Sequence, residues 1–280
     1  MYWQTSRRKL SLERPLVMAI LNVTPDSFSD GGEFLSVDAA LKQAEKFIGE
    51  GADIIDLGGE STRPNSTRVS IEEEINRTAR VIEAIVKCFD VPVSIDTTKS
   101  VVAEAAIGAG AEIINDISGL RFDERIGEIA AKYNAGLVLM HSRGTFETMH
   151  KQNPVENITY EVAAVFRSSI EKGRSLGVKS ANIALDIGIG FSKTFEQNLE
   201  LLAKLDRLVA EFPEYPMLVG TSRKSFIGKI LGGVPATERL SGSLASAALA
   251  VWHGANIVRV HDVRETVELI KTVSAIRERQ

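Results

Sequence analysis

The sequence has very little cysteine. Cys88 is the only one among 280 residues, so no disulfide can form within the chain. Because disulfide-dependent proteins belong to oxidising compartments, a lone cysteine favours a cytoplasmic protein. Cys88 lies near the end of a helical pattern, and we expect it to be a buried core residue.

Long apolar runs are missing too. No stretch approaches the roughly 20 residues that a membrane-spanning helix needs, so we expect no membrane partner. The first 15 residues are basic and have no apolar segment before Pro15, which argues against a secretory signal. We expect them to form an N-terminal strand or hairpin that closes the barrel described below.

Charge of one sign is not in excess. The chain has 33 basic and 37 acidic residues, and a formal net charge of −4 gives no reason to expect a nucleic-acid partner.

The common nucleotide and zinc motifs are absent from the sequence. GTSRKS lacks the first glycine of a P-loop, and DIGIGFSK lacks the dinucleotide-binding spacing. No H-E-x-x-H zinc pattern occurs among the histidines, which are His141, His150, His253 and His261.

Strand and helix patterns alternate along the chain. In residues 91–116 an apolar, β-branched run ends on Asp96, an Ala-rich helical pattern stops at Gly110, and a second apolar run ends on Asn115. Similar runs recur, and we expect strands over 17–22, 54–57, 91–95, 111–115, 137–141, 183–186, 217–219 and 257–260. Helical patterns follow over 37–50, 72–87, 101–110, 123–133, 156–177, 197–209, 240–254 and 263–278.

This alternation predicts an α/β fold, a single (β/α)8 TIM barrel. No linker or shift in composition divides the chain. We therefore expect one barrel domain over 16–280, preceded by the N-terminal extension over 1–15. In such a barrel the carboxyl ends of all strands meet at one mouth, where ligands bind.

Three polar residues follow strongly apolar strands and should lie deep in that mouth: Asp96, Asn115 and Asp186. Each alone has a plainer explanation, as a helix cap or a solvated turn; Asp96, for example, could cap the helix near Thr98. Their convergence is harder to explain in that way. A buried carboxylate is costly unless it is hydrogen-bonded, so the set favours a flat heterocycle with amino and ring N–H groups.

A second group is cationic and is expected on loops nearer the rim: Arg63, Lys224, Arg259 and His261. Such a group suits a phosphate or a diphosphate. Asn22 offers a neutral oxygen that could bind Mg²⁺ beside it. Met140 and Phe191, at strand ends, are either core residues or walls for an aromatic ligand.

Seven motifs follow one another along the chain: NVTPDSFSDGG at 22–32, GGESTRP at 58–64, SIDTTK at 94–99, NDISG at 115–119, LMHSRG at 139–144, GTSRKSFIG at 220–228 and RVHDV at 259–263. Together they resemble the dihydropteroate synthase family, from about Leu16 to the last helix. One departure is that Ile187 stands where the family usually has proline in Asp-Pro-Gly-x-Gly-Phe.

The resemblance implies that 6-hydroxymethyl-7,8-dihydropterin diphosphate is joined to p-aminobenzoate, with release of diphosphate. It also implies a homodimer, and the apolar last two helices agree with this. Loops 22–34 and 58–70 would close over the diphosphate and complete the second site. The implied catalytic residues are Asp96, Lys224, Arg63, Arg259 and His261.

The resemblance also assigns binding residues. The pterin would be held by Asp96, Asn115, Met140, Asp186, Gly220 and Lys224. The diphosphate would be held by Asn22, Arg63, Arg259 and His261, with Mg²⁺ at Asn22. The p-aminobenzoate would lie against Thr62, Arg63, Pro64, Gly190, Phe191, Lys224 and Ser225.

Two other functions use the same deep pocket. A pterin-dependent methyltransferase would not need the STRP and SRKS loops or the cationic group. A non-catalytic paralogue that binds pterin or another protein would be expected to lose loop residues, yet all of the implied ones are present. The synthase is the better interpretation.

Overall fold

The eight predicted strands form a closed parallel barrel. The computed structural model describes residues 1–23, 33–62 and 66–279, and for 33–36 it describes the backbone only. Within these ranges the strands close in the order β10-β3-β4-β5-β6-β7-β8-β9, which confirms the predicted (β/α)8 barrel. They are β3 (Leu16–Asn22), β4 (Ile54–Gly58), β5 (Val93–Asp96), β6 (Ile113–Asp116), β7 (Gly136–Met140), β8 (Ile183–Asp186), β9 (Met217–Val219) and β10 (Ile257–Val260).

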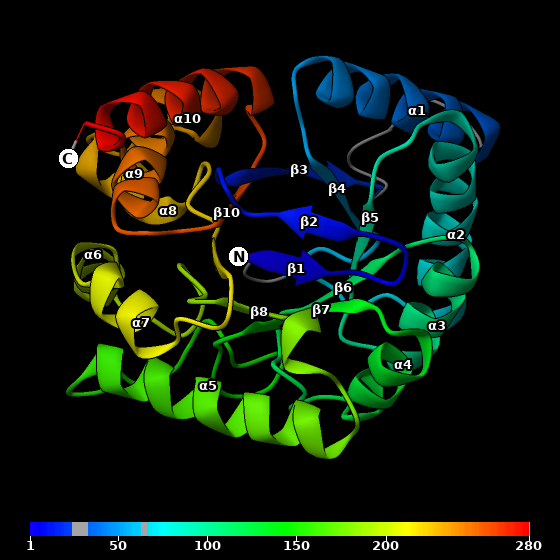
Figure 1. Ribbon diagram of the computed structural model, residues 1–280, viewed down its shortest axis with the longest axis horizontal. Helices are drawn as coiled ribbons and strands as arrows, with labels where there is room; N and C mark the ends of the chain where they lie inside the picture. The colour runs from blue at the N-terminus through cyan, green and yellow to red at the C-terminus, as the bar shows by residue number, and fades with distance from the viewer. Residues whose placement is uncertain (24–32, 63–65, 280) are drawn as a thin grey trace.

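Helices surround these strands (Figure 1). They are α1 (Glu33–Gly49), α2 (Ile71–Cys88), α3 (Ser100–Gly108), α4 (Arg125–Tyr133), α5 (Ile158–Ser175), α6 (Phe195–Ala203), α7 (Leu205–Glu211), α8 (Ser225–Ile230), α9 (Leu240–Trp252) and α10 (Val263–Arg277), with short 3-10 turns at Ser180–Asn182 and Ala236–Glu238. In the described parts of the chain, no helix has the length and apolar character needed to span a membrane.

Three details of the sequence-based assignment were wrong. The helix expected over 197–209 is interrupted at Lys204, whose φ of −115° is not helical, and so becomes α6 and α7. Helix α8 was not predicted, because six residues are too few to reveal a helical period. Cys88 is exposed, because α2 ends there and Phe89 packs against the core in its place.

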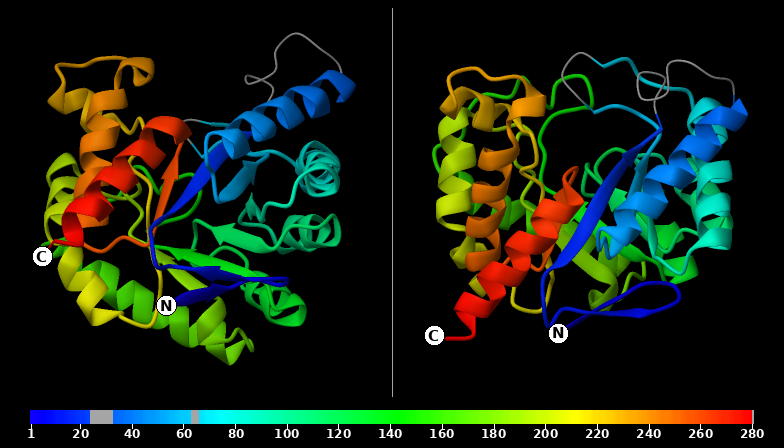
Figure 2. Two further views of the ribbon diagram at one scale, coloured as in Figure 1. Left: turned by 45° about the horizontal axis from the view of Figure 1, so that its top comes forward. Right: turned by 90° about the horizontal axis from the view of Figure 1, so that it is seen from above.

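The N-terminal residues form the expected hairpin. Strand β1 (Tyr2–Gln4) pairs antiparallel with β2 (Lys9–Ser11). Trp3 is fully buried, and its indole Nε1 donates to the carbonyl oxygen of Asn182 (2.8 Å). Its apolar neighbours come from seven barrel strands: Met18, Ile54, Ile113, Val138, Ala184, Leu218 and Ile257. The hairpin lies across one end of the barrel (Figure 2) and closes its floor.

Strand register aligns the polar residues at the opposite end. Asn22 of β3 pairs with Gly58 of β4, Gly58 pairs with Asp96 of β5, and Asp96 pairs with Asn115 of β6. On the other side of the barrel, Met140 pairs with Asp186. Because neighbouring parallel strands place these positions at one level, Asn22, Gly58, Asp96 and Asn115 form a continuous row at the mouth.

Candidate active site

A buried ion network links four strands at the mouth. Arg259 on β10 donates from Nε to Asp56 Oδ2 (2.6 Å) and from Nη2 to Asp96 Oδ2 (2.7 Å). Asn115 on β6 donates from Nδ2 to the same oxygen of Asp56 (3.1 Å). Asp56 and Asn115 are buried, and Arg259 is half-buried. The guanidinium therefore ties the two carboxylates of β4 and β5 to β10.

Burial sets the electrostatics of this network. It raises the pKa of Asp96 to about 7, with Arg259 opposing the shift and Asp56 adding to it. Burial alone would lower the pKa of Arg259, but Asp56 and Asp96 hold it above its ordinary value. The guanidinium therefore stays charged, while Asp96 changes protonation near neutral pH.

Two acceptor atoms of the network are buried and have no hydrogen-bond partner within the described ranges, namely Asp56 Oδ1 and Asn115 Oδ1. Leaving a buried acceptor unpaired costs about 1–3 kcal/mol. A ligand that presents N–H groups to this part of the mouth would satisfy both atoms.

Asp186 and Lys224 also lie deep in the mouth. We call the set of Asp96, Asn115, Asp186 and Lys224 the deep group. Asp186 Oδ1 accepts from the amide of Gly188 (2.7 Å), and Lys224 Nζ donates to the carbonyl oxygen of Ile189 (2.6 Å). Burial raises the pKa of Asp186, while the Gly188 amide and Lys224 oppose that shift. Burial lowers the pKa of Lys224 to about 8, against the attraction of Asp186. The amine is therefore mostly protonated at pH 7 and loses its charge as the pH rises through about 8.

The loop between β8 and α6 is folded around Lys193. Its Nζ donates to the carbonyl oxygens of Gly188 (2.8 Å) and Phe191 (2.9 Å), and lies 2.8 Å from His141 Nδ1. Gly188 has φ +63°, and a Cβ there would lie 2.0 Å from the carbonyl oxygen of His141, so only glycine fits. Ile187, in the position of the family's proline, is buried in the core and acts as a packing residue.

This loop carries Phe191 to the mouth. Lys224 Nζ lies 4.3 Å from the centroid of the Phe191 ring, a cation–π distance. Gly190 has φ +83°, and a Cβ on it would come within 3.0 Å of Lys224 Cδ. Met140 belongs to the same apolar cluster as Phe191, with Ile117, Phe146 and Met149. An aromatic wall and an ammonium group thus share one side of the mouth.

The loop between β4 and α2 is held at its two ends by one lysine. Lys99 Nζ donates to Glu60 Oε1 (3.0 Å), to Glu74 Oε2 (2.6 Å) and to the carbonyl oxygen of Val69 (2.7 Å). The amide of Val69 donates to Glu60 as well (2.6 Å). Burial raises the pKa of Glu74, which Lys99 opposes. We call this the loop staple: Lys99, Glu60, Val69 and Glu74.

The other predicted residues lie around the rim. Asn22 Oδ1 is 3.4 Å from the place that a Cβ on Gly58 would occupy, so its carboxamide faces the row that contains Asp96. His261 Nδ1 lies 3.0 Å from Ser222 Oγ. Thr62 is half-buried, and Ser225 is exposed in the first turn of α8. A Cβ on Gly220 would be 3.6 Å from Arg259 Cβ. Arg63, Pro64 and residues 24–32 of the first motif lie outside the described residues.

Comparison with known proteins identifies the family of this barrel. The model of the pterin binding enzyme family matches residues 18–261. A dihydropteroate synthase from Synechocystis is 46% identical over 264 residues, which cover 94% of this chain and 91% of the relative. The chain belongs to the dihydropteroate synthase family.

Solved structures of dihydropteroate synthases agree in both sequence and fold. The enzyme from Clostridium difficile, solved in the presence of pteroic acid, has a TM-score of 0.89 and 44% identity, covering 94% of this chain and 97% of that one. The enzyme from Xanthomonas albilineans, solved with 4-aminobenzoic acid, has a TM-score of 0.91 and 38% identity, covering 99% of both chains.

The structure corrects the expected positions of two cations in this dihydropteroate synthase family member. Lys224 was expected near the rim, but its buried ammonium group interacts with Asp186 deep in the mouth. Arg259 was expected on a loop near the rim with the other cations, but it lies within β10 and reaches down to Asp56 and Asp96. Asp56 itself was missed. The sequence did contain a sign that Asp56 has a function: it is a charged residue inside the apolar run Ile54–Gly58, and a strand buried on both faces normally has no charged residue. The alternative in which Asp96 caps α3 does not hold, because the N-cap residue is Lys99 and Asp123 Oδ2 accepts from the Ser100 amide (2.9 Å).

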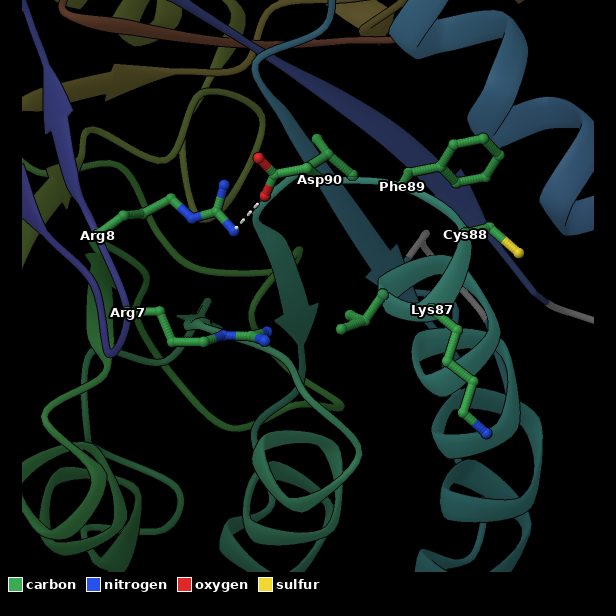
Figure 3. Close-up of a pocket in the computed structure, with 8 residues that line it drawn as sticks. Arg7, Arg8, Lys87, Cys88, Phe89 and Asp90 are labelled. Carbon is green, nitrogen blue, oxygen red and sulfur yellow. Dashed lines mark ion pairs between the residues drawn. The ribbon is translucent and has the colours of Figure 1, made fainter.

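A separate cavity of about 270 Å³ lies away from the mouth, beside the hairpin and the end of α2 (Figure 3). Its lining includes Arg7, Arg8, Lys87, Cys88 and Asp90. Arg8 is already paired with Asp90 (3.2 Å) and with the buried Glu112 (2.8 Å). Arg7 also pairs with Glu112 (3.4 Å) and Lys87 pairs with Glu83 (2.8 Å), so each basic side chain in the lining has an acidic partner.

Proposed function

We propose that the mouth of this barrel condenses 6-hydroxymethyl-7,8-dihydropterin diphosphate with p-aminobenzoate, to give 7,8-dihydropteroate and diphosphate. The observation that carries this assignment is the buried network of Asp56, Arg259, Asp96 and Asn115, with its two unpaired acceptors. A pterin edge carries an exocyclic amine and ring N–H groups, which are the donors that such acceptors require. Family membership supports the same substrate class.

The pterin lies across the deep group in this proposal. Asp96, Asn115 and Asp186 accept its N–H groups, and Lys224 donates to its acceptor atoms. Met140 packs against one face, since its side chain is apolar and buried at the same level as Asp186. Arg259 must share or release Asp96 when the pterin enters, because its Nη2 occupies one oxygen of that carboxylate.

The diphosphate lies above the pterin, near Asn22, Arg259 and His261. The side-chain oxygen of Asn22 stands in the same row as Asp96, and a hard oxygen donor of this kind suits Mg²⁺, which takes few protein ligands. No cluster of three acidic, histidine or cysteine side chains was found in the described residues, so the protein would supply only a small share of the ligands. Bound Mg²⁺ would neutralise charge on the leaving diphosphate.

The reaction breaks the bond between the pterin methylene carbon and the diphosphate oxygen, and forms a bond from that carbon to the amine nitrogen of p-aminobenzoate. The amine then loses a proton. Asp96 and Asp186 favour the positive charge that develops on the pterin, and the cations favour the departing diphosphate. An aromatic amine is neutral at pH 7, so its attack needs no strong base. We assign the p-aminobenzoate site to Thr62, Gly190, Phe191, Lys224 and Ser225; Arg63 and Pro64, which the family resemblance adds, lie outside the described residues.

A coupling assay tests the proposal. The purified chain is incubated with the pterin diphosphate, p-aminobenzoate and Mg²⁺, and both products are measured. We expect dihydropteroate and diphosphate to appear in equal amounts, and neither to appear without p-aminobenzoate. Pterin binding without turnover would instead support a non-catalytic paralogue and contradict the proposal.

Two properties of the whole protein remain predictions within this proposal: a homodimer and a cytoplasmic location. Leu249, Trp252 and Ile276 are exposed apolar residues on α9 and α10, which suits a face shared by two copies. Leu249→Glu should therefore give a monomer in sedimentation experiments, while the control Leu199→Glu on α6 should not. A wild-type mass that stays monomeric at all concentrations would contradict the dimer.

A further inference from the structure

The loop between β7 and α5 holds a histidine between two sides of the expected p-aminobenzoate site. His150 Nε2 lies 2.8 Å from the carbonyl oxygen of Thr62, which belongs to the loop after β4. The same imidazole contacts the ring of Phe191, which belongs to the loop after β8, with centroids 5.3 Å apart and planes inclined by 31°. His150 thus touches both residues from one position.

The hydrogen bond defines which nitrogen carries the proton. A carbonyl oxygen can only accept, so Nε2–H of His150 must donate to Thr62. The bond therefore forms with the Nε2 tautomer and also with the imidazolium. It holds the backbone of Thr62 to the β7 loop.

The position of His150 is fixed by its own loop. Ser192 Oγ donates to the carbonyl oxygen of Met149 (2.8 Å), and Arg143 Nη2 donates to the carbonyl oxygens of Ser192 (2.7 Å) and Asn153 (2.8 Å). Met149 is buried in the apolar cluster that contains Phe191. The residue before His150 is therefore attached to the β8 loop, and His150 projects from a supported backbone.

A second contact joins the same two loops. The guanidinium carbon of Arg68 lies 4.6 Å from the centroid of the Phe146 ring. Arg68 is at the far end of the β4 loop, next to Val69 of the loop staple. The β7 loop therefore contacts the β4 loop at two described residues, Thr62 and Arg68.

We propose that His150 is a positioning residue for the second substrate, an aromatic amine of the p-aminobenzoate type. This inference rests on the proposed function. By holding Thr62 and packing on Phe191, His150 sets the distance between the two walls of the aromatic site. Its effect falls on p-aminobenzoate and not on the pterin, because no described contact links it to Asp96, Asn115 or Asp186.

Steady-state kinetics on a set of variants tests this role. His150→Ala removes both contacts, and we expect KM for p-aminobenzoate to rise about five- to tenfold, the size expected for losing a hydrogen bond and a ring contact. We expect kcat and KM for the pterin diphosphate to stay within about twofold of wild type. The matched control is Lys151→Ala, which changes the exposed neighbouring residue and should leave all three constants unchanged.

Two conservative variants separate the contacts. His150→Gln keeps an N–H that can donate to Thr62, and His150→Phe keeps a ring against Phe191. Each should restore part of the lost affinity, to a KM within about threefold of wild type. These variants also decide the question if His150→Ala fails to fold.

The outcomes are distinguishable. A wild-type chain without coupling activity would overturn the proposed function together with this inference. An active wild type whose p-aminobenzoate KM is unchanged in His150→Ala would overturn the inference alone. Equal rises in KM for both substrates, or Gln and Phe variants as impaired as alanine, would also overturn it, because they would indicate general disruption of the mouth.

Discussion

The two ends of this barrel are built from the same eight strands and differ in almost every other respect. At the floor, Trp3 packs with apolar residues from seven barrel strands, and its indole donates a hydrogen bond to the carbonyl oxygen of Asn182. At the mouth, Asp56, Asp96, Asp186, Lys224 and Arg259 bring charges into partly or fully buried positions. The floor is mainly apolar, with Glu112 as its buried charge, whereas the mouth brings several charged side chains together.

The difference shows where free energy of folding is gained and where it is given up. Burying apolar surface contributes about 25 cal/mol per Å², so closing the floor stabilises the fold. Buried ion pairs at the mouth add little net stability, because desolvation offsets much of the attraction. A group retained there despite this cost is best explained by ligand binding. The following predictions test that division.

The largest effect is expected at the floor. Trp3→Ala should lower the free energy of unfolding by about 3–5 kcal/mol, because it removes a large buried ring and leaves a cavity. Pterin affinity of the folded fraction should not change. Denaturant unfolding and calorimetry measure the two quantities, and Tyr2→Ala, at an exposed position of the same strand, is the control. A loss of pterin affinity in Trp3→Ala would contradict the separation of the two ends.

The loop staple is the expected exception, a charged group at the mouth that is needed for stability. Lys99→Met leaves Glu60 and Glu74 buried without their cation, and should cost about 3 kcal/mol in free energy of unfolding. Burial already raises the pKa of Glu74, so the loss should be smaller at pH 5 than at pH 8.

The control for this prediction is Lys132→Met, which removes an exposed ion pair with Glu104 on the outer helices. It should cost less than about 1 kcal/mol. A similar small cost for Lys99→Met would show that the staple does not stabilise the loop after β4.

A smaller effect, on binding as well as stability, is expected in the deep group. Asp186→Ala should weaken pterin binding by about 1.5–3 kcal/mol, the range for a hydrogen bond to a charged group. Its free energy of unfolding should fall by about 1–3 kcal/mol, because the Gly188 amide loses its acceptor, while the desolvation cost of the carboxylate is removed. Calorimetric titration with a pterin measures the first quantity, with Asp206→Ala on exposed α7 as the control. Unchanged pterin affinity would remove Asp186 from the site.

The smallest effect concerns pH. Burial raises the pKa of Asp96 to about 7, so the folded state binds this proton more tightly than the unfolded state. Its contribution to stability is therefore greatest below the unfolded pKa near 3.8 and is lost as pH rises through 7. Pterin binding needs the carboxylate, so affinity should change in the opposite direction and rise about tenfold between pH 6 and pH 8.

Asp96→Asn is the matched variant for this test, since it keeps the shape and removes the titration. Pterin titrations at several pH values should show a smaller slope in this variant than in wild type. An equal slope in both proteins would assign the pH dependence to another group.

Much of the fold was predictable because the patterns that encode it are local. Short apolar runs of three to seven residues marked all eight barrel strands, most of them followed by polar residues, and the longer helices between them followed a helical period. The errors were also local. Helix α8 is too short to show a period, and the exposure of Cys88 depends on where α2 ends, which its apolar period alone does not decide.

The sequence by itself determined that Asp96, Asn115 and Asp186 lie at one end of a barrel, because the carboxyl ends of all strands in that fold are at the same end. Only the tertiary structure decided how these residues are paired. Arg259 meets Asp56 across 203 positions of sequence, and His150 meets Thr62 across 88. Such contacts depend on barrel closure and on the reach of individual side chains, and neither leaves a periodic trace in the sequence.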